Sequence, residues 1–193
     1  NIESQSTKKA LLLAENILTG GIKWADSINN YMVSNIRKWL NGNSGSEKES
    51  DYSRDAGFLQ TAFTTEAQKL ITPTTVDNSA TSTLPNILTE EQKTTDWKNG
   101  KNEYACGDTT DKIFLLSKQE ATKEAYGFGV YNASNNTRIR VTTDYAKATG
   151  AYQSATAGDG GWWWLRSPYF LMEYSARLVS IDGDANDYSS VDD

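Results

Sequence analysis

The residue types that most often do chemistry are scarce in this sequence, because its 193 residues include no histidine and a single cysteine. Without histidine, serine and cysteine nucleophiles lack their usual general base, and imidazole metal sites are excluded. Cys106 has no second cysteine with which to form a disulfide or a thiolate zinc site. No histidine is present to activate its thiol, so we interpret Cys106 as structural or incidental.

The acidic stretch 182–193 has the most suggestive spacing for a metal ion. Side-chain oxygens stand at positions one, three, five, nine and twelve of an EF-hand-like calcium loop, on Asp182, Asp184, Asn186, Ser190 and Asp193. However, Asp187 occupies the position that needs glycine, and Asp193 replaces the bidentate glutamate. A strand-like segment also precedes the loop where an EF-hand has a helix. We therefore expect no cofactor, and calcium is the alternative to a solvated hairpin.

Other catalytic patterns are weak. The glycine-rich segments at 20–21, 127–129 and 158–161 lack the lysine and hydroxyl residue of a phosphate-binding loop, so they favour turns. Aspartate and glutamate are abundant, but no spacing singles out the carboxylate pair of a glycosidase. We therefore expect that the protein is not an enzyme.

Composition narrows the class of partner. The net charge of −6 disfavours nucleic acid and anionic membrane surfaces, which would repel an acidic chain. No apolar run approaches the ~20 residues that cross a membrane, and Glu15 interrupts the run at 10–14. Length and a hydrophobic content of 37% are typical of one globular domain over residues 1–193. The cellular location stays open, with the cell surface or extracellular space favoured.

Short strands and helices are expected to position the candidate functional side chains. Apolar runs of strand length occur at 10–14, 113–116, 139–141, 162–165 and 176–181. Asp182-Gly183 follows the last run and predicts a hairpin turn. Hydroxyl residues stand where helices can begin, at Ser34, Thr65, Ser117 and Thr143. We expect the second of these helices to turn Leu70 and Ile71 inward. Long polar segments lie between the elements, so the pattern predicts an irregular α+β domain.

Three adjacent tryptophans open the segment 162–168, whose sequence is Trp-Trp-Trp-Leu-Arg-Ser-Pro. Their apolar surface is costly to expose, so they predict a buried anchor. A buried guanidinium needs partners, and we expect Arg166 and Ser167 to tie the anchor to neighbouring loops by hydrogen bonds. The predicted core consists of Trp39, Phe114, Leu115, Trp163, Trp164 and Leu165.

The chain changes character after Pro168, because residues 169–193 contain no lysine and are rich in aromatic residues, serine and aspartate. A packed anchor followed by such a segment suggests recognition, and we predict a recognition segment at 168–193. Its aromatic side chains would supply contact area at low entropic cost, and Arg177 and the aspartates would supply polar selectivity. The predicted ligand, a protein or a glycan, would be bound by Tyr169, Phe170, Leu171, Tyr174, Arg177, Ser180, Asp182, Asp184, Asn186, Asp187, Tyr188 and Ser190.

The order and spacing of several segments resemble a known family. The segments include Ser-Asn-Ile-Arg-Lys-Trp-Leu-Asn at 34–41, Thr-Asp-Lys-Ile-Phe-Leu-Leu-Ser at 110–117, Trp-Trp-Leu-Arg-Ser-Pro at 163–168 and Val-Ser-Ile-Asp-Gly at 179–183. From about Lys9 to Val191, the chain resembles uncharacterised microbial domains with a Trp-Trp-Leu-Arg-Ser-Pro core. That family looks related to the C-type-lectin-like, formylglycine-generating-enzyme-like fold, which variable proteins of diversity-generating retroelements also use.

The resemblance implies a non-catalytic ligand-binding protein whose C-terminal face a diversity-generating retroelement varies. In such proteins the variable positions lie in and after a tryptophan-containing stretch, and adenine-directed mutagenesis leaves mainly Tyr, Ser, Asp, Asn, Phe, Ile and Leu. The implied variable positions are Tyr169, Phe170, Leu171, Tyr174, Ser180, Asp184, Asn186, Asp187, Tyr188 and Ser190. Two alternatives remain: a constant structural or adhesion module of a larger surface protein, and a divergent enzyme on the same fold. The enzyme would need active-site cysteines, and the chain has Cys106 alone.

Overall fold

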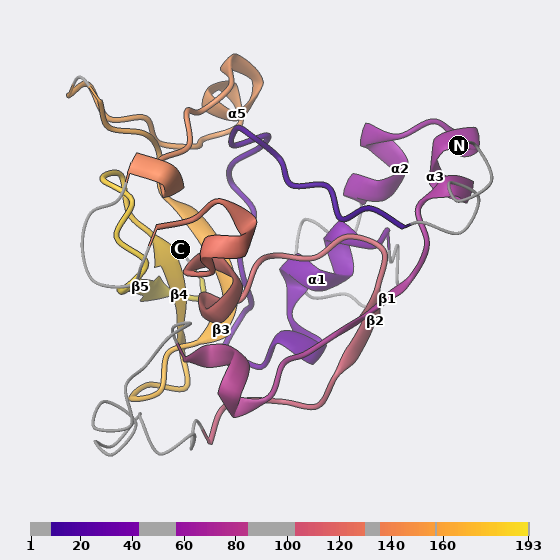
Figure 1. Cartoon of the computed structure of the whole chain (residues 1–193), viewed down its shortest axis with the longest axis horizontal. Coiled ribbons are helices and arrows are strands. Elements are labelled where there is room, and N and C mark those ends of the chain that lie inside the picture. The colour runs from indigo at the N-terminus through magenta and orange to yellow at the C-terminus, as the bar shows by residue number, and fades with distance from the viewer. Residues whose placement is uncertain (1–8, 43–56, 85–102, 130–135, 157, 193) are drawn as a thin grey trace.

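Short helices and small antiparallel sheets make up the computed structural model of this chain, so the architecture is mixed α+β (Figure 1). The structure describes residues 9–42, 57–84, 103–129, 136–156 and 158–192. The α-helices are α1 (Asn35–Leu40), α2 (Phe58–Ala62), α3 (Thr65–Leu70), α4 (Lys118–Ala121) and α5 (Asp144–Ala148). The 3-10 helices are η2 (Tyr31–Val33), η4 (Ala80–Thr83), η7 (Glu124–Tyr126) and η8 (Asn136–Arg138). The strands are β1 (Thr74–Val76), β2 (Thr109–Asp111), β3 (Trp163–Pro168), β4 (Ser175–Val179) and β5 (Asp187–Ser190).

The tryptophan block forms one edge of a three-stranded antiparallel sheet with the order β3-β4-β5. Trp163 pairs with Val179 and Trp164 with Leu178, and the register then shifts before Pro168. β5 continues the sheet on the other side of β4 and lies farthest from α1 (Figure 1). The strands predicted at 162–165 and 176–181 are thus confirmed, with shifted ends. β1 and β2 form a separate two-stranded sheet.

Alternation along β3 and β4 divides the core between the two faces of the sheet. Trp164 and Leu178 belong to one hydrophobic cluster, which also contains residues of η2 and α1. Their neighbours Leu165 and Val179 belong to a second cluster, which includes Ala121 of α4. Successive side chains of a strand point to opposite faces, so β3 and β4 are buried on both faces, whereas β5 is exposed or partly buried. This explains why the block reads as a continuous apolar run rather than an alternating one.

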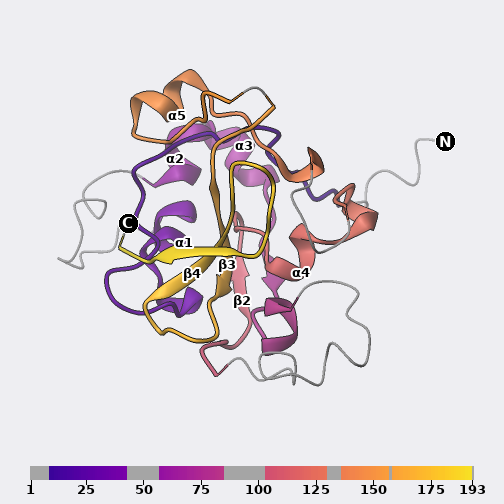
Figure 2. The same cartoon turned by 90° about the vertical axis from the view of Figure 1, so that its left-hand side faces the viewer.

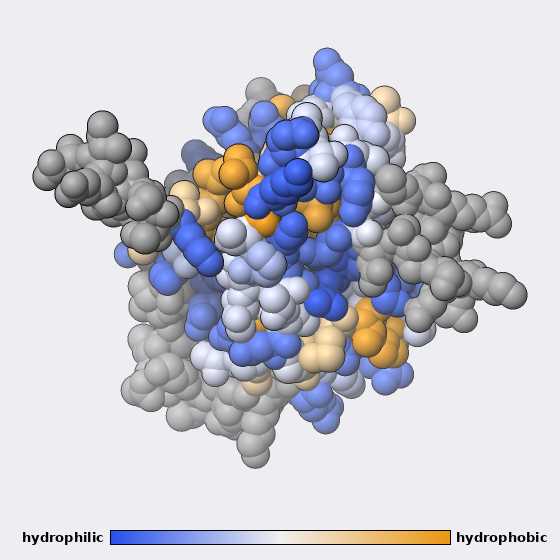
Figure 3. Space-filling view, turned by 90° about the vertical axis from the view of Figure 1, so that its right-hand side faces the viewer, coloured by the Kyte–Doolittle hydropathy of each residue, from blue (hydrophilic) through white to orange (hydrophobic). Residues whose placement is uncertain are grey.

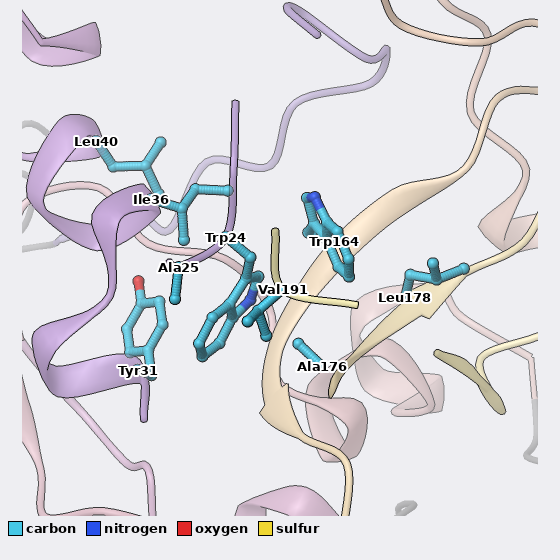
Figure 4. Packing of buried hydrophobic residues seen from close by; sticks show 9 residues of the cluster. All are labelled: Trp24, Ala25, Tyr31, Ile36, Leu40, Trp164, Ala176, Leu178 and Val191. Carbon is cyan, nitrogen blue, oxygen red and sulfur yellow. The ribbon is translucent and has the colours of Figure 1, made fainter. Parts of the chain in front are cut away.

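Trp24 lies at the centre of the first cluster and was absent from the predicted core (Figure 4). Its side chain is fully buried, and its indole Nε1 donates a hydrogen bond of 2.9 Å to the carbonyl oxygen of Leu165. The Tyr31 ring centroid lies 6.1 Å from that of Trp24. Of the predicted core residues, Trp164 and Leu165 are buried, while Trp39, Phe114, Leu115 and Trp163 are partly buried.

Three predicted strands are wrong. Residues 10–14 form no strand, and Leu11, Leu12 and Leu13 are exposed. Residues 113–116 are also irregular, because side chains occupy their backbone groups: the Asn41 amide bonds both the N–H and the carbonyl of Ile113. Residues 139–141 contribute a single bridge, between Arg140 and Gly161. An apolar run becomes a strand only where a partner strand lies alongside it.

The cap residues predicted most helix starts correctly. Ser34 caps α1, Thr143 caps α5, and Ser117 forms a complete capping box with Glu120 at α4. The exception is α3, where the hydroxyl of Thr64, one residue earlier than predicted, accepts a hydrogen bond of 3.2 Å from the N–H of Ala67.

The inward face predicted for α3 is also wrong, because Leu70 is 83% exposed. α3 lies on the side of the molecule away from the β3-β4-β5 sheet (Figure 1). Figure 3 shows this side, where hydrophobic side chains form separate small patches among hydrophilic ones. Among the described residues, no helix has both the length and the apolar character needed to cross a membrane.

Candidate ligand-binding surface

Arg166 and Ser167 hold the tryptophan block to the loops beside it, as the sequence predicted. The backbone N–H of Arg166 donates to the carbonyl of Leu116 at 2.9 Å, and its Nη1 donates to the carbonyl of Leu115 at 2.7 Å. The same Nη1 forms an ion pair with Glu120. The Ser167 hydroxyl accepts a hydrogen bond of 2.9 Å from the N–H of Lys118. The guanidinium is therefore drawn inside because carbonyl and carboxylate oxygens compensate for its lost hydration.

Aromatic rings and one guanidinium form a stack directly after this anchor. The rings of Tyr169 and Tyr188 are parallel within 8° with centroids 3.8 Å apart. Arg177 lies over the Tyr169 ring, with its guanidinium carbon 4.6 Å from the centroid, and is the cross-strand neighbour of Tyr188. Phe170 meets Tyr169 edge-on at 5.2 Å. The stack buries Tyr169 and Arg177, but Tyr188 remains 40% exposed.

Buried cations hold the loop 180–186 between β4 and β5. Arg138 donates from Nε to the carbonyl of Gly183 at 2.7 Å, and the Lys118 ammonium donates to the side-chain oxygen of Asn186 at 2.6 Å. Arg177 donates to the backbone carbonyl of Asn186. Burial lowers the pKa of Lys118 well below its ordinary value; Arg177 lowers it further and Asp184 raises it. The loop is thus anchored from within the molecule.

The carboxylates of this loop are engaged by the loop itself. Asp182 accepts from the Ser180 hydroxyl and from the N–H of Asp184, and Asp184 accepts from the N–H of Asn186 at 2.9 Å. Such bonds are typical of turns in which an aspartate caps nearby backbone. Among the described residues, no group of three or more histidine, cysteine or acidic side chains could hold a metal ion. Asp193, the twelfth position of the calcium-like pattern, lies outside those residues.

Asn29 holds the turn between β3 and β4, and sequence reasoning missed it. Its buried side-chain amide donates to the carbonyl oxygens of Tyr169, Met172 and Ser175, at 3.1, 2.9 and 2.7 Å. Its backbone N–H donates to the carbonyl of Glu173 at 2.6 Å. No local pattern marks this asparagine, because all four acceptors lie far away in the sequence.

The predicted ligand-binding residues lie in three places along the sheet. The turn 170–174 and the loop 180–186 stand at opposite ends of β4, and Tyr188 lies between them on β5. The exposed members are Leu171, Tyr174, Asn186, Asp187 and Tyr188. The partly buried members are Phe170, Ser180, Asp182, Asp184 and Ser190. Tyr169 and Arg177 are buried. We call the five exposed side chains the display surface.

A second polar cluster lies at η2, α1 and β2. Asp111 is buried and forms an ion pair of 2.8 Å with Arg37, and it also accepts from the Thr109 hydroxyl at 2.6 Å. Asn78 donates to that hydroxyl at 3.1 Å. Cys106 lies near this cluster, and burial raises the pKa of its thiol. A raised pKa disfavours the reactive thiolate, which fits a structural role for Cys106.

Fold and site together define a mixed α+β domain that carries a display surface on a three-stranded antiparallel sheet. The chain belongs to the family DUF6273, described as a domain of unknown function, which matches residues 7–193. Neither the curated proteins nor the solved structures contain a match to the chain.

Proposed function

We propose that this protein is a non-catalytic ligand-binding protein and that the display surface binds the ligand. The observation that carries the proposal is the contrast between the outside and the inside of one segment. Outside, Leu171, Tyr174 and Tyr188 are exposed aromatic or apolar side chains. Inside, buried Asn29 holds the turn before β4 and buried Arg138 holds the loop after it.

The turn and the loop that carry the exposed side chains are preorganised, because buried residues already hold their backbone in place. Ordering a loop on binding costs free energy, and a loop that is already held in place avoids this cost. Tyrosine adds a large contact area with few rotatable bonds and a hydroxyl that can hydrogen-bond. Exposed aromatic side chains on a held backbone therefore suit the recognition of a protein or a glycan better than catalysis.

The proposal extends to a C-type-lectin-like scaffold and to diversification by a retroelement. Its support is the position of the implied variable residues, most of which are exposed or partly buried after the anchor. Tyr169 differs, because its ring is buried between Arg177 and Tyr188. We therefore expect Tyr169 to vary less than the others among related copies.

Related genomic copies test the diversification. An adjacent reverse transcriptase, with a near-copy of the coding segment for 162–193 and adenine-biased differences, is the expected result. Differences spread evenly along the chain would contradict diversification, and identical copies would favour a constant structural or adhesion module.

Binding itself is tested on the purified protein with a glycan array and a displayed peptide library. The triple variant Leu171→Ser, Tyr174→Ala, Tyr188→Ala should abolish the binding seen with the natural protein. The matched control is Leu18→Ser, Tyr145→Ala, Tyr152→Ala, which alters three other exposed side chains outside the segment. Equal loss of binding in both triple variants, or in neither, would contradict the display surface as the site.

A further inference from the structure

β5 is an edge strand of its sheet, and every second residue along it turns its backbone N–H and carbonyl away from β4. Val191, directly after β5, donates its N–H to the carbonyl of Tyr174 at 2.9 Å, so this N–H points toward β4. Peptide groups alternate in direction along an antiparallel strand. The N–H and carbonyl groups of Tyr188 and Ser190 therefore point away from β4. The Tyr188 N–H there donates a hydrogen bond of 2.9 Å to the Asp187 carboxylate. Among the described residues, no strand pairs with β5 on that side (Figure 2).

The surface around this edge is negatively charged. Glu173, Asp187 and Asp192 are exposed, while the single basic residue of 169–192, Arg177, is buried against the Tyr169 ring. Arg138 and Lys118 act electrostatically on Asp184 inside the loop, so Asp184 adds little to the outward charge. Lys23, outside this segment, acts electrostatically on Asp192 and offsets part of its charge. The exposed carboxylates of Glu173 and Asp187 therefore keep the edge negative.

Tyr188 adds an aromatic face to the same edge. Its ring is held parallel to that of Tyr169, which Arg177 contacts. A ring with one face against Tyr169 and 40% of its residue surface exposed presents π density to solvent. Such a face attracts ammonium and guanidinium groups.

The open backbone edge of β5, the negative charge around it and the exposed Tyr188 ring all favour the same kind of ligand. We propose that β5 receives an extended, lysine- or arginine-rich peptide segment as an added strand, paired through the carbonyl of Tyr188 and the backbone of Ser190. Its cationic side chains lie against Tyr188, Asp187 and Asp192. This inference rests on the proposed function and names its ligand class. Strand addition draws affinity from backbone hydrogen bonds and selectivity from alternate side chains.

The test uses fluorescent peptides of about ten residues and anisotropy measurements on the full chain, since strands commonly have this length or less. The probe alternates lysine and threonine, and its partners are a glutamate–threonine peptide and the lysine–threonine peptide with every backbone amide N-methylated. The lysine–threonine peptide should bind, and the glutamate peptide should not. N-methylation should weaken binding roughly tenfold or more, because the edge hydrogen bonds are lost.

Protein variants then locate the site. Tyr188→Ala should weaken binding roughly fivefold, as expected for an exposed cation–π contact. Asp187→Asn keeps the ring and removes one charge, so it should weaken binding and reduce the salt dependence of the affinity. Tyr145→Ala, an exposed tyrosine on α5, is the matched control and should bind like the natural protein. Thermal melting confirms that each variant is folded.

Each contrary outcome has a definite meaning. Equal binding of the N-methylated peptide would overturn strand addition, and equal binding of the glutamate peptide would overturn the charge argument. A glycan-array signal that the display-surface triple variant abolishes, without any binding of the lysine peptide, would overturn this inference and leave the proposed function standing. Absence of binding to every peptide and glycan would count against both.

Discussion

The ammonium group of Lys118 donates a hydrogen bond of 2.6 Å to the side-chain oxygen of Asn186. No sequence pattern predicts this contact, because the two residues are 68 positions apart. Lys118 is fully buried, and Asn186 belongs to the exposed display surface. One polar bond thus connects the interior at α4 to the start of the candidate binding edge. The electrostatic cost of the buried ammonium leads to the first prediction.

The free energy of unfolding should rise with pH below the ordinary lysine pKa of 10.5, because of Lys118. Burial lowers the pKa of this lysine in the folded protein well below the ordinary 10.5. Between those two pKa values the unfolded chain binds more protons, so stability increases as pH rises. Lys118→Met should flatten this rise in urea unfolding curves measured at several pH values. An unchanged slope in the variant would assign the effect to another group.

Asn29→Ala should destabilise the protein by about 2 kcal/mol, because the buried amide leaves and the Tyr169 carbonyl loses this donor. The Met172 and Ser175 carbonyls lose the amide as well, but each still accepts from a backbone N–H. Urea unfolding measures the change. Asn30→Ala is the adjacent control: it removes the cap of η2, whose Met32 N–H donates to the Asn30 side chain, and should cost only about 1 kcal/mol. Similar losses in both variants would contradict a special role for Asn29 in the turn.

Leu165→Ala should cost about 3 kcal/mol of unfolding free energy, because this fully buried side chain packs in the second cluster. Leu70→Ala makes the same chemical change at an 83% exposed position of α3, and should change stability by less than about 0.5 kcal/mol. Thermal or urea unfolding of both variants provides the comparison. A cost at Leu70 equal to that at Leu165 would contradict the exposed placement of α3.

Asp111→Asn should be strongly destabilising, by about 3 kcal/mol, because it removes the charge that pairs with Arg37 at a buried position. Asp144→Asn is the control, since its ion pair with Lys147 spans 3.6 Å on an exposed helix. It should leave the urea midpoint unchanged. A midpoint for Asp111→Asn that matches the natural protein would show that the pair is dispensable.

Sequence reasoning succeeded where the signal and its structural effect lie within a few residues. Ser117 and Glu120 cap α4 because their side chains reach backbone groups of the same turn. Gly183 supports the loop after β4 with a φ of 83°, a conformation that costs glycine little. These features depend on local geometry alone.

Prediction failed where a segment needed a distant partner. Residues 10–14 have the composition of a strand, but the described part of the chain places no strand beside them. Leu70 has the spacing of an inward residue, but α3 lies away from the β3-β4-β5 sheet (Figure 1). An apolar residue becomes a core residue only when another element covers it.

The sequence by itself determined the mixed α+β class, most helix starts, the burial of Trp164 and the hydrogen-bonding role of Arg166. Tertiary structure decided that Trp24 lies at the centre of the first cluster and that Asn29 and Lys118 hold the loops. It also decided that Arg177 packs against the Tyr169 ring rather than lying in solvent. The physical reason is separation along the chain. Trp24 meets the Leu165 carbonyl across 141 positions and Lys118 meets Asn186 across 68, distances over which no periodicity or cap motif acts.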